Sequence, residues 1–418
     1  MKLLTLTVTL FCCALLNGQA WTTYDVSNSG IVSDLGIKIN FDTNGDVFVG
    51  TQNGLSIKSG STWTSHTVAT GDLPNNSVSS TLRNNSDIWV GTDNGLARYN
   101  GTTWSTYNTG NSVLPDNRIY CLEKTQSGIV WIGTRDGGLC SYNGTAFTPL
   151  SISANISVTY NRAHAIKMDA NGVLWIGTAG GGLARYNTSN GQWAQYTTSN
   201  STIPSNDVYS LAIAPDGKIW AGTSAGVGIF DPSVTSFTNI FTTSNSILPN
   251  NYIRGVSVDM GGRGYIAMGY GGVARVETNM TITTLWNSSN SALPTDTIWH
   301  CNYDAGRLWV ASFTEGIAVM DVDVSISELL GENLTISANP TVTNGNTVLS
   351  LEAAVPSATD VEMFSASGQL VWSQTNVSVI PGTTTTLTLP MEGLARGRYI
   401  VTVTDADHRH YSLSVFAQ

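Results

Sequence analysis

A short string of residues recurs seven times along the chain, and this repeat restricts the folds that the sequence can adopt. Its clearest copy is Trp131-Ile132-Gly133-Thr134, followed by Gly138-Leu139. With the position of Gly133 as the anchor, successive copies are 41, 42, 44, 45, 46 and 43 residues apart, and the anchors are Gly50, Gly91, Gly133, Gly177, Gly222, Met268 and Ala311. A period of about 40 to 50 residues with aromatic and glycine signatures is typical of four-stranded propeller blades. The sequence therefore predicts an all-β protein with a seven-bladed β-propeller.

Each repeat divides into four short strands. In the third copy they are expected at residues 119–123, 130–134, 138–142 and 146–150, with an Asn143-Gly144 hairpin turn before the last. Gly133 has no side chain, and we expect it to leave room for an aromatic ring of the next blade.

The fourth strands show how the ring closes. They begin at Trp21, Trp63, Trp104, Phe147, Trp193, Phe237 and Ile282. The first of them precedes the first complete blade, and the last blade stops after its third strand. Residues 21–24 are therefore predicted to pair with residues 318–321 and complete blade seven, which removes an exposed sheet edge.

The repeats resemble the two-component-regulator propeller repeat, whose recurring core is Trp-Ile-Gly-Thr, a short loop, Gly-Leu and an aromatic residue. In that family the propeller is usually the periplasmic sensory part of a membrane-bound histidine kinase. Here no transmembrane segment or kinase follows the propeller, so the resemblance implies the fold, over residues 21–324, and not the signalling role.

The first 20 residues are predicted to be a signal peptide. Lys2 precedes an apolar run of 14 residues, Leu3 to Leu16, and Gly18-Gln19-Ala20 is a small-residue cleavage site. Because about 20 residues are needed to cross a bilayer as a helix, we expect no transmembrane anchor. The mature chain is expected to begin at Trp21.

After a linker at 325–333, a second all-β segment is predicted at 334–418. Its seven short strands are expected at 334–337, 348–351, 361–364, 370–372, 385–389, 399–403 and 411–415. Short strands separated by turn signals favour a small β-sandwich.

This segment carries a second resemblance, through Asn339-Pro340, Gly368-Gln369 with Val371, and Leu394 with Gly397 and Tyr399. These motifs are similar to those of the C-terminal sorting domain of the type IX secretion system of Bacteroidetes-type bacteria. The resemblance implies that the type IX secretion machinery is a partner. It also implies that the protein passes through the periplasm and is secreted or displayed on the outer-membrane surface. An ordinary carbohydrate-binding or adhesive sandwich is the alternative.

Composition excludes several functions. Charged residues make up 11% of the chain, against about 25% in average domains, and the net charge is -10 without a basic run. A nucleic-acid partner is therefore not expected. Cys121, Cys140 and Cys301 have no paired spacing, so we expect buried thiols rather than disulfides or a zinc site. No metal or cofactor is predicted, and we expect a monomer.

Candidate ligand-binding residues lie where propeller loops surround the axial channel. One position is Asn or Asp in all seven repeats, namely Asp34, Asn76, Asn117, Asn161, Asn206, Asn251 and Asp296. Such side chains commonly close turns onto the backbone, and we interpret this ring as structural. The repeats differ at a second set, which supplies our candidates: Arg118, Tyr120, Arg135, Asp136, Arg162, His164, Tyr209, Tyr252, Arg254, Tyr270, Trp299, His300 and Glu315.

These residue types favour ligand binding. Aromatic rings suit stacking on sugars, and guanidinium groups suit binding of carboxylates. The predicted function is binding of an extracellular glycan or protein. Because no recognised catalytic motif is present, no catalytic residue is assigned. The alternatives are a polysaccharide lyase, in which His164, His300 and the arginines act beside a substrate carboxylate, and a purely structural surface protein.

Overall fold

The computed structural model describes residues 21–42 and 44–322, and from the C-terminal part residues 328–329, 334–339, 346–353, 357–365, 369–381, 383–391, 394, 397–404 and 410–417. Within these ranges the regular elements are all β-strands. They form nine antiparallel sheets of four strands each. The predicted signal peptide, residues 1–20, lies outside the described residues, as does most of the predicted linker.

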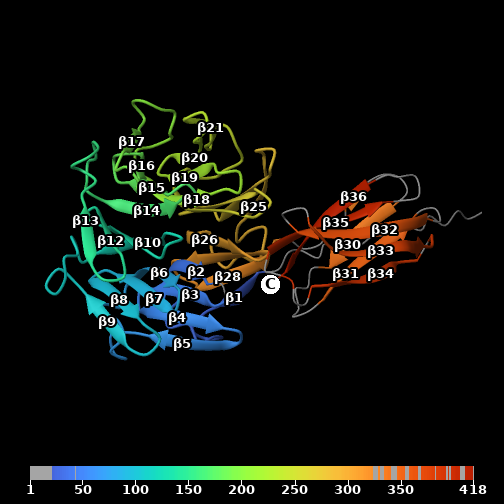
Figure 1. Cartoon of the computed structure of the whole chain (residues 1–418), viewed down its shortest axis with the longest axis horizontal. Helices are drawn as coiled ribbons and strands as arrows, with labels where there is room; N and C mark the ends of the chain where they lie inside the picture. The colour runs from blue at the N-terminus through green and yellow to red at the C-terminus, as the bar shows by residue number, and fades with distance from the viewer. Residues whose placement is uncertain are drawn as a thin grey trace, which may run out of the picture.

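Seven of the sheets are blades arranged around a common axis (Figure 1). The innermost strand of each blade lies beside that of the next, and the last lies beside the first, so the ring is closed. In blade order the inner strands are β2 (Gly36–Phe41), β6 (Val78–Asn84), β10 (Ile119–Lys124), β14 (Ala163–Met168), β18 (Val208–Ile213), β22 (Ile253–Val258) and β26 (Ile298–Asp304). The predicted seven-bladed propeller is confirmed.

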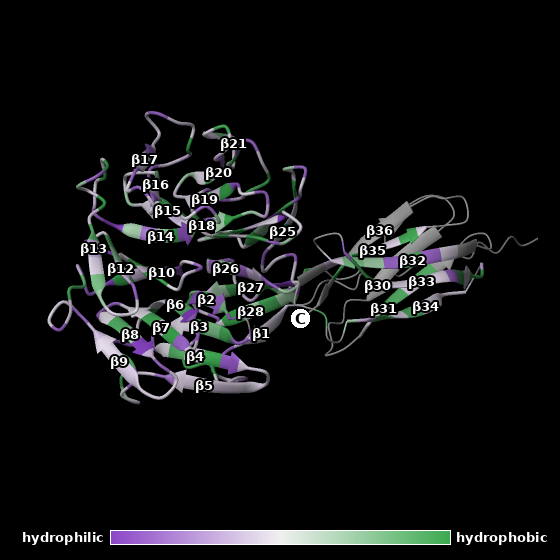
Figure 2. Ribbon diagram, in the orientation of Figure 1, coloured by the Kyte–Doolittle hydropathy of each residue, from purple (hydrophilic) through white to green (hydrophobic). Residues whose placement is uncertain are grey.

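The second strand of each blade forms the core. These strands are β3 (Val47–Thr51), β7 (Asp87–Thr92), β11 (Val130–Thr134), β15 (Val173–Thr178), β19 (Ile219–Thr223), β23 (Gly264–Met268) and β27 (Arg307–Ser312). They carry the repeated Trp-Ile-Gly-Thr string, and every residue of β3, β11, β15, β19 and β23 is buried. Both faces are apolar because a neighbouring blade covers each of them, as the hydrophobic colouring of β3 and β7 illustrates (Figure 2).

The outer half of each blade consists of a third and a fourth strand. The third strands are β4 (Gly54–Ser59), β8 (Gly95–Tyr99), β12 (Leu139–Tyr142), β16 (Leu183–Asn187), β20 (Gly226–Asp231), β24 (Val273–Val276) and β28 (Ile317–Asp321). The fourth strands are β5 (Thr62–His66), β9 (Trp104–Tyr107), β13 (Phe147–Leu150), β17 (Trp193–Tyr196), β21 (Ser236–Phe241), β25 (Ile282–Trp286) and, for blade seven, β1 (Thr22–Tyr24).

Strand β1 closes the ring as predicted. It pairs antiparallel with β28 through Thr22 and Val319, Thr23 and Ala318, and Tyr24 and Ile317. The pairing reaches Ile317 but not Asp321, so it lies slightly earlier on β28 than the sequence indicated. The first described residue of the chain, Trp21, is buried at 7% exposure.

The anchor glycines have a different neighbour from the one expected. A Cβ at Gly91 would lie 2.6 Å from Cγ2 of Ile119, and one at Gly222 would lie 2.9 Å from Cγ2 of Ile253. Both isoleucines begin the inner strand of the next blade. At Gly133 the nearest atoms belong to Cys121 and Ala163. The expectation of an aromatic ring there is wrong, because the glycine faces the narrow part of the wedge between blades, where only an aliphatic side chain fits.

The ring of seven Asn and Asp residues is structural. The side-chain oxygen of each accepts a hydrogen bond from a backbone N–H of the preceding loop, as Asn206 does from Thr198 at 2.8 Å and Asn251 from Thr243 at 2.7 Å. The equivalent bonds in the other blades are made by Asp34, Asn76, Asn117, Asn161 and Asp296. The donor usually lies eight residues earlier in the sequence, so one Asn or Asp side chain holds a whole loop between two blades closed.

Two further sheets follow the propeller and form the small β-sandwich. One contains β29 (Glu328–Leu329), β30 (Leu334–Asn339), β31 (Asn346–Ala353) and β34 (Thr385–Pro390), and the other β33 (Leu370–Val379), β32 (Ser357–Ser365), β35 (Gly397–Thr404) and β36 (His410–Ala417). Their facing sides share a core that includes Leu349, Val361, Leu389 and Val401. All seven predicted strands are present, each longer than predicted.

The predicted sorting residues lie partly in this sandwich. Tyr399 is 5% exposed and belongs to the core, and Asn339 and Gly397 are terminal residues of strands. Pro340 and Gly368 lie outside the described residues.

The three cysteines of the propeller are buried free thiols, as expected. Burial raises the pKa of Cys121 and of Cys301 to about 12 and that of Cys140 to about 11. Their thiols are therefore protonated near neutral pH, and protonated thiols are poor nucleophiles.

Candidate functional site

Every inner strand carries a β-bulge at the same place. The pairing between the first and second strands of each blade skips the second residue of the inner strand. A bulge of this kind changes the direction of one side chain, and the hydrogen-bonded pairing of the two strands continues beyond it. The skipped residues, which we call the mouth ring, are Ile37, Ser79, Tyr120, His164, Tyr209, Arg254 and Trp299. All seven are half-buried at the start of the inner strands, at one mouth of the channel.

Part of the mouth ring is a continuous run of ring contacts. Tyr120 stacks on His164 with centroids 5.5 Å apart, and His164 meets Tyr209 at 5.1 Å. Tyr209 contacts Tyr252 at 5.4 Å, and Tyr252 lies in the loop before β22. With Arg254 and Trp299, these residues form the aromatic arc, which crosses blades three to seven. Six of the predicted candidates are thus brought together.

Arg254 lies at the centre of the aromatic arc. Its guanidinium carbon is 4.5 Å from the ring centroid of Trp299 and 5.4 Å from that of Tyr209. Its Nη1 donates a hydrogen bond to the Tyr252 hydroxyl at 3.1 Å. Among the described residues no carboxylate pairs with it, and its buried Nε has no hydrogen-bond partner. Arg254 is therefore a positioned cation available to an anionic group.

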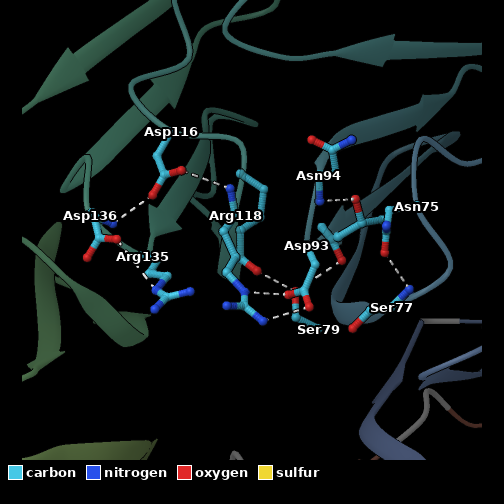
Figure 3. Close-up of polar contacts among 12 residues, drawn as sticks. Asn75, Ser77, Ser79, Asp93, Asn94, Asp116, Arg118, Arg135 and Asp136 are labelled. Atoms are coloured by element: carbon cyan, nitrogen blue, oxygen red, sulfur yellow. Dashed lines mark hydrogen bonds and ion pairs between the residues drawn. The ribbon is translucent and has the colours of Figure 1, made fainter.

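Of the other three candidate arginines, two donate hydrogen bonds to aspartates and the third, Arg135, is only within ion-pair range of one. Arg118 donates from Nε and Nη2 to the two carboxylate oxygens of Asp93, both at 2.8 Å, as Figure 3 shows. Arg162 donates from Nη2 to Asp136 at 3.2 Å, and Nε of Arg135 lies 3.5 Å from the same carboxylate. The guanidinium of Arg162 also covers the ring of Tyr120 at 5.8 Å. These residues border the arc on the side of blades two to four.

The charge environment keeps the histidine of the arc neutral. Burial, followed by the positive charges of Arg162 and Arg254, lowers the pKa of His164 to about 4. Burial likewise raises the pKa of Tyr209. Near neutral pH the arc therefore consists of neutral rings around one unpaired cation.

Three predicted residues lie elsewhere. His300 follows the bulged residue Trp299, and its side chain therefore points into the channel wall. It is 6% exposed and accepts a hydrogen bond from the backbone N–H of Ile39. Tyr270 is 64% exposed in the loop between β23 and β24, and Glu315 is exposed between β27 and β28. In the described part of the chain no ring or ion-pair contact joins these two to the arc.

The structure adds residues that the sequence analysis missed. Ile37 and Ser79 complete the mouth ring, Phe313 stacks on Trp299 at 4.5 Å, and Tyr160 lies under Arg162 at 5.1 Å. Asp93 was missed as the partner of Arg118. Phe313 and Asp93 follow second strands, so position within the repeat was a signal for both of them.

The fold is a seven-bladed propeller, and aromatic rings and Arg254 line one mouth of its channel. Residues 113–136, 157–180 and 202–225 match the family model described as two component regulator propeller. The chain therefore carries two component regulator propeller repeats, and the resemblance to that repeat is confirmed.

Solved structures show the same fold at low sequence identity. PorZ, an essential bacterial surface component of the type-IX secretion system of Porphyromonas gingivalis, matches with a TM-score of 0.60 and 15% identity over 94% of this chain. The chain spans 60% of the length of PorZ. YCF48 bound to D1 peptide matches with a TM-score of 0.55 and 12% identity, over 76% of this chain and 98% of YCF48. No curated protein matches the sequence.

The extracellular domain of the one component system BT4673 from B. thetaiotaomicron is also similar, with 15% identity, but its TM-score is 0.45. The match covers 91% of this chain and 68% of that one, and a score this low carries no inference. In the described part of the chain, no helix has the length and apolar character needed to cross a membrane.

Proposed function

We propose that this protein is a secreted or surface-displayed binding propeller whose ligand is an acidic glycan held at the aromatic arc. The observation that carries the proposal is the placement of Arg254, stacked on Trp299 and without a carboxylate partner among the described residues. A guanidinium fixed in this way presents paired N–H donors, which suit a carboxylate.

The rings beside Arg254 supply the second part of the recognition. Tyr120, His164 and Tyr209 offer neutral, half-buried ring surface next to the cation. A uronic-acid residue has a sugar ring that stacks on such surface and a carboxylate within reach of an arginine. The arc crosses five blades, so it suits an oligosaccharide of several sugars. A protein ligand with an exposed acidic side chain is the alternative.

The test is an array that contains uronic-acid oligosaccharides and their neutral counterparts. We expect the wild-type protein to bind the acidic set. Arg254→Gln should weaken that binding about tenfold or more, because hydrogen bonds to a charged group contribute about 1.5–3 kcal/mol. Arg185→Gln, on the third strand of blade four, is the matched control and should bind like the wild type.

Four outcomes would count against the proposal. Equal binding of neutral and acidic glycans would remove the role of the carboxylate, and an unaffected Arg254→Gln variant would place the site elsewhere. Binding of an acidic protein but of no glycan would establish the alternative ligand. Release of unsaturated uronates from the bound oligosaccharides, followed by ultraviolet absorbance, would instead identify the lyase.

Export by the type IX secretion system is part of the proposal. It is supported by the motifs at Asn339-Pro340, Gly368 and Gly397 with Tyr399, by the sandwich fold, and by the likeness to PorZ, a surface component of that system. The removable part is proposed to be residues 334–418, with the propeller at 21–324 as the exported cargo.

The export proposal has its own test. In a bacterium with a type IX system, deletion of residues 334–418 should leave the propeller in the periplasm, whereas the full chain reaches the surface or the medium. Recovery of the truncated propeller outside the cell would overturn the sorting role and leave the glycan site untouched.

A further inference from the structure

The channel beneath the aromatic arc contains a cavity of about 320 Å³ that is open to solvent. All seven inner strands contribute to its wall, and the polar side chains among them include Lys38, Ser80, Glu123, Lys167, Ser210 and His300. The cavity is therefore a polar chamber on the axis of the ring, separate from the rings at the mouth.

Lys38 is the cation in this chamber that has no protein partner. The described residues include five lysines, and four of them have an oxygen acceptor: Lys58 with Gly60, Lys124 with Arg83, Lys167 with Glu123 and Lys218 with Asp216. No described residue accepts a hydrogen bond from the Lys38 ammonium. Lys38 is half-buried, and a charge held partly out of bulk water without a protein partner costs free energy, so its retention points to a ligand.

His300 supplies a second unused donor next to Lys38. Its Nδ1 accepts a hydrogen bond from the Ile39 N–H at 3.3 Å, and Ile39 is the residue after Lys38. The proton of the neutral imidazole therefore lies on Nε2. No described residue accepts a hydrogen bond from this Nε2–H. Strands β2 and β26 are neighbours in the ring, so both donors belong to the same side of the channel.

The charges around the chamber leave one positive charge in excess. Lys167 and Glu123 form an ion pair at 3.1 Å and cancel one another. Burial and then the charge of Lys167 lower the pKa of Lys38 to about 8, so near neutral pH it remains mostly protonated. Burial, with Lys38 and Lys167, holds the pKa of His300 well below its usual range, and the thiols of Cys121 and Cys301 stay protonated.

We propose that the channel binds one small monovalent anion, a halide or a carboxylate, held by the ammonium of Lys38 and the Nε2–H of His300. One negative charge balances the single excess positive charge of the chamber, whereas a divalent anion would leave a negative charge in excess. A water molecule takes about 30 Å³ of liquid volume, so the cavity holds an anion of this size together with several waters.

The site is tested with the full-length mature protein and sodium chloride, by the excess linewidth of the chlorine NMR signal. We expect a saturable excess that falls at least tenfold in Lys38→Met. The excess should persist in Lys58→Met, a control outside the chamber. Sodium acetate should compete with chloride if the chamber prefers carboxylates, and should leave the linewidth unchanged if it admits only halides.

A second variant, Lys38→Arg, tests the proposal while it keeps a positive charge at this position. In the wild type the excess linewidth should disappear as pH rises through the Lys38 pKa of about 8, because the neutral amine no longer attracts an anion. In Lys38→Arg it should persist above that pH, since guanidinium stays charged. Equal linewidths in the wild type and Lys38→Met, or the same pH profile in the wild type and Lys38→Arg, would overturn the proposal.

Discussion

The ring of Trp21 meets the ring of Trp286 edge-on, with their centroids 6.4 Å apart. Trp21 precedes β1, and Trp286 ends the fourth strand of blade six, so this contact joins the first described residue of the chain to the blade before the closure point. Both belong to one core cluster with Ile298, Leu308 and Val310.

Truncation of this contact should destabilise the whole ring. Trp21→Ala removes a large side chain that is 7% exposed, and comparable truncations in protein cores cost about 3–5 kcal/mol. The measurement is denaturant unfolding, with the exposed Thr22→Ala as control. Deletion of residues 21–24 should also expose the edge of β28 and produce oligomers in size-exclusion chromatography. A deletion variant that stays monomeric with unchanged stability would contradict closure by β1.

The loop-closing amides predict a pair of matched substitutions at Asn206. Asn206→Ala leaves the Thr198 N–H without its acceptor and should lower the free energy of unfolding by about 1–2 kcal/mol. Asn206→Asp keeps an acceptor oxygen at the position where Asp34 and Asp296 stand in other blades, and should cost far less. Thermal unfolding of both variants checks this, and an equal loss in the two would show that the hydrogen bond is not the cause.

The lowered pKa of His164 predicts that the folded protein loses stability in acid. Its folded-state pKa of about 4 lies below the unfolded value, so between these values the unfolded chain binds the extra proton. Stability should therefore fall as pH decreases from about 6.5 to about 4, by at most about 1.4 kcal/mol per pH unit from this group. His164→Phe should reduce the slope of unfolding free energy against pH in that range. Identical slopes in variant and wild type would assign the acid sensitivity to other groups.

Lys38 predicts a dependence of the same sign on the alkaline side, because its pKa is also lowered in the folded state. Because its folded pKa of about 8 lies below the usual 10.5, the unfolded chain holds the proton more tightly in that window. The wild type should gain stability as pH rises through it, whereas Lys38→Met should not. Near neutral pH, in a buffer that contains neither halide nor carboxylate, Lys38→Met should be more stable by about 1–3 kcal/mol. A less stable variant would show that the ammonium has a structural partner.

Much of the architecture follows from the repeat alone. The spacing of Trp131-Ile132-Gly133-Thr134 and its copies predicted the blade number, the strand order and the closure by residues 21–24. What it could not predict was local backbone geometry. The bulge at Trp299 shifts the alternation by one residue, so His300 faces the channel wall and not the mouth. The same shift placed Ile37 and Ser79 in the mouth ring, although neither residue type suggested a site.

Contacts between loops could not be predicted from the sequence either. Arg118, Arg135 and Arg162 were selected as a group with Arg254, yet only Arg254 lacks an aspartate partner among the described residues. Asp136 follows Arg135 directly in the sequence, but Asp93 and Asp136 each come from the blade before that of Arg118 and Arg162, and their distance to those two arginines depends on how far the blades are rotated about the axis. No pattern along the chain encodes that rotation.

The seven bulges give the protein an unusual freedom to diverge. Each bulged residue contributes its side chain to the mouth while the hydrogen bonds of the ladder pass it by, so replacing it leaves the strand pairing intact. Seven such positions can change one at a time, by single codon substitutions, without any change in the scaffold. Descendants of one ancestral ring could in this way acquire different specificities, and a library randomised at these positions alone would sample them in the laboratory.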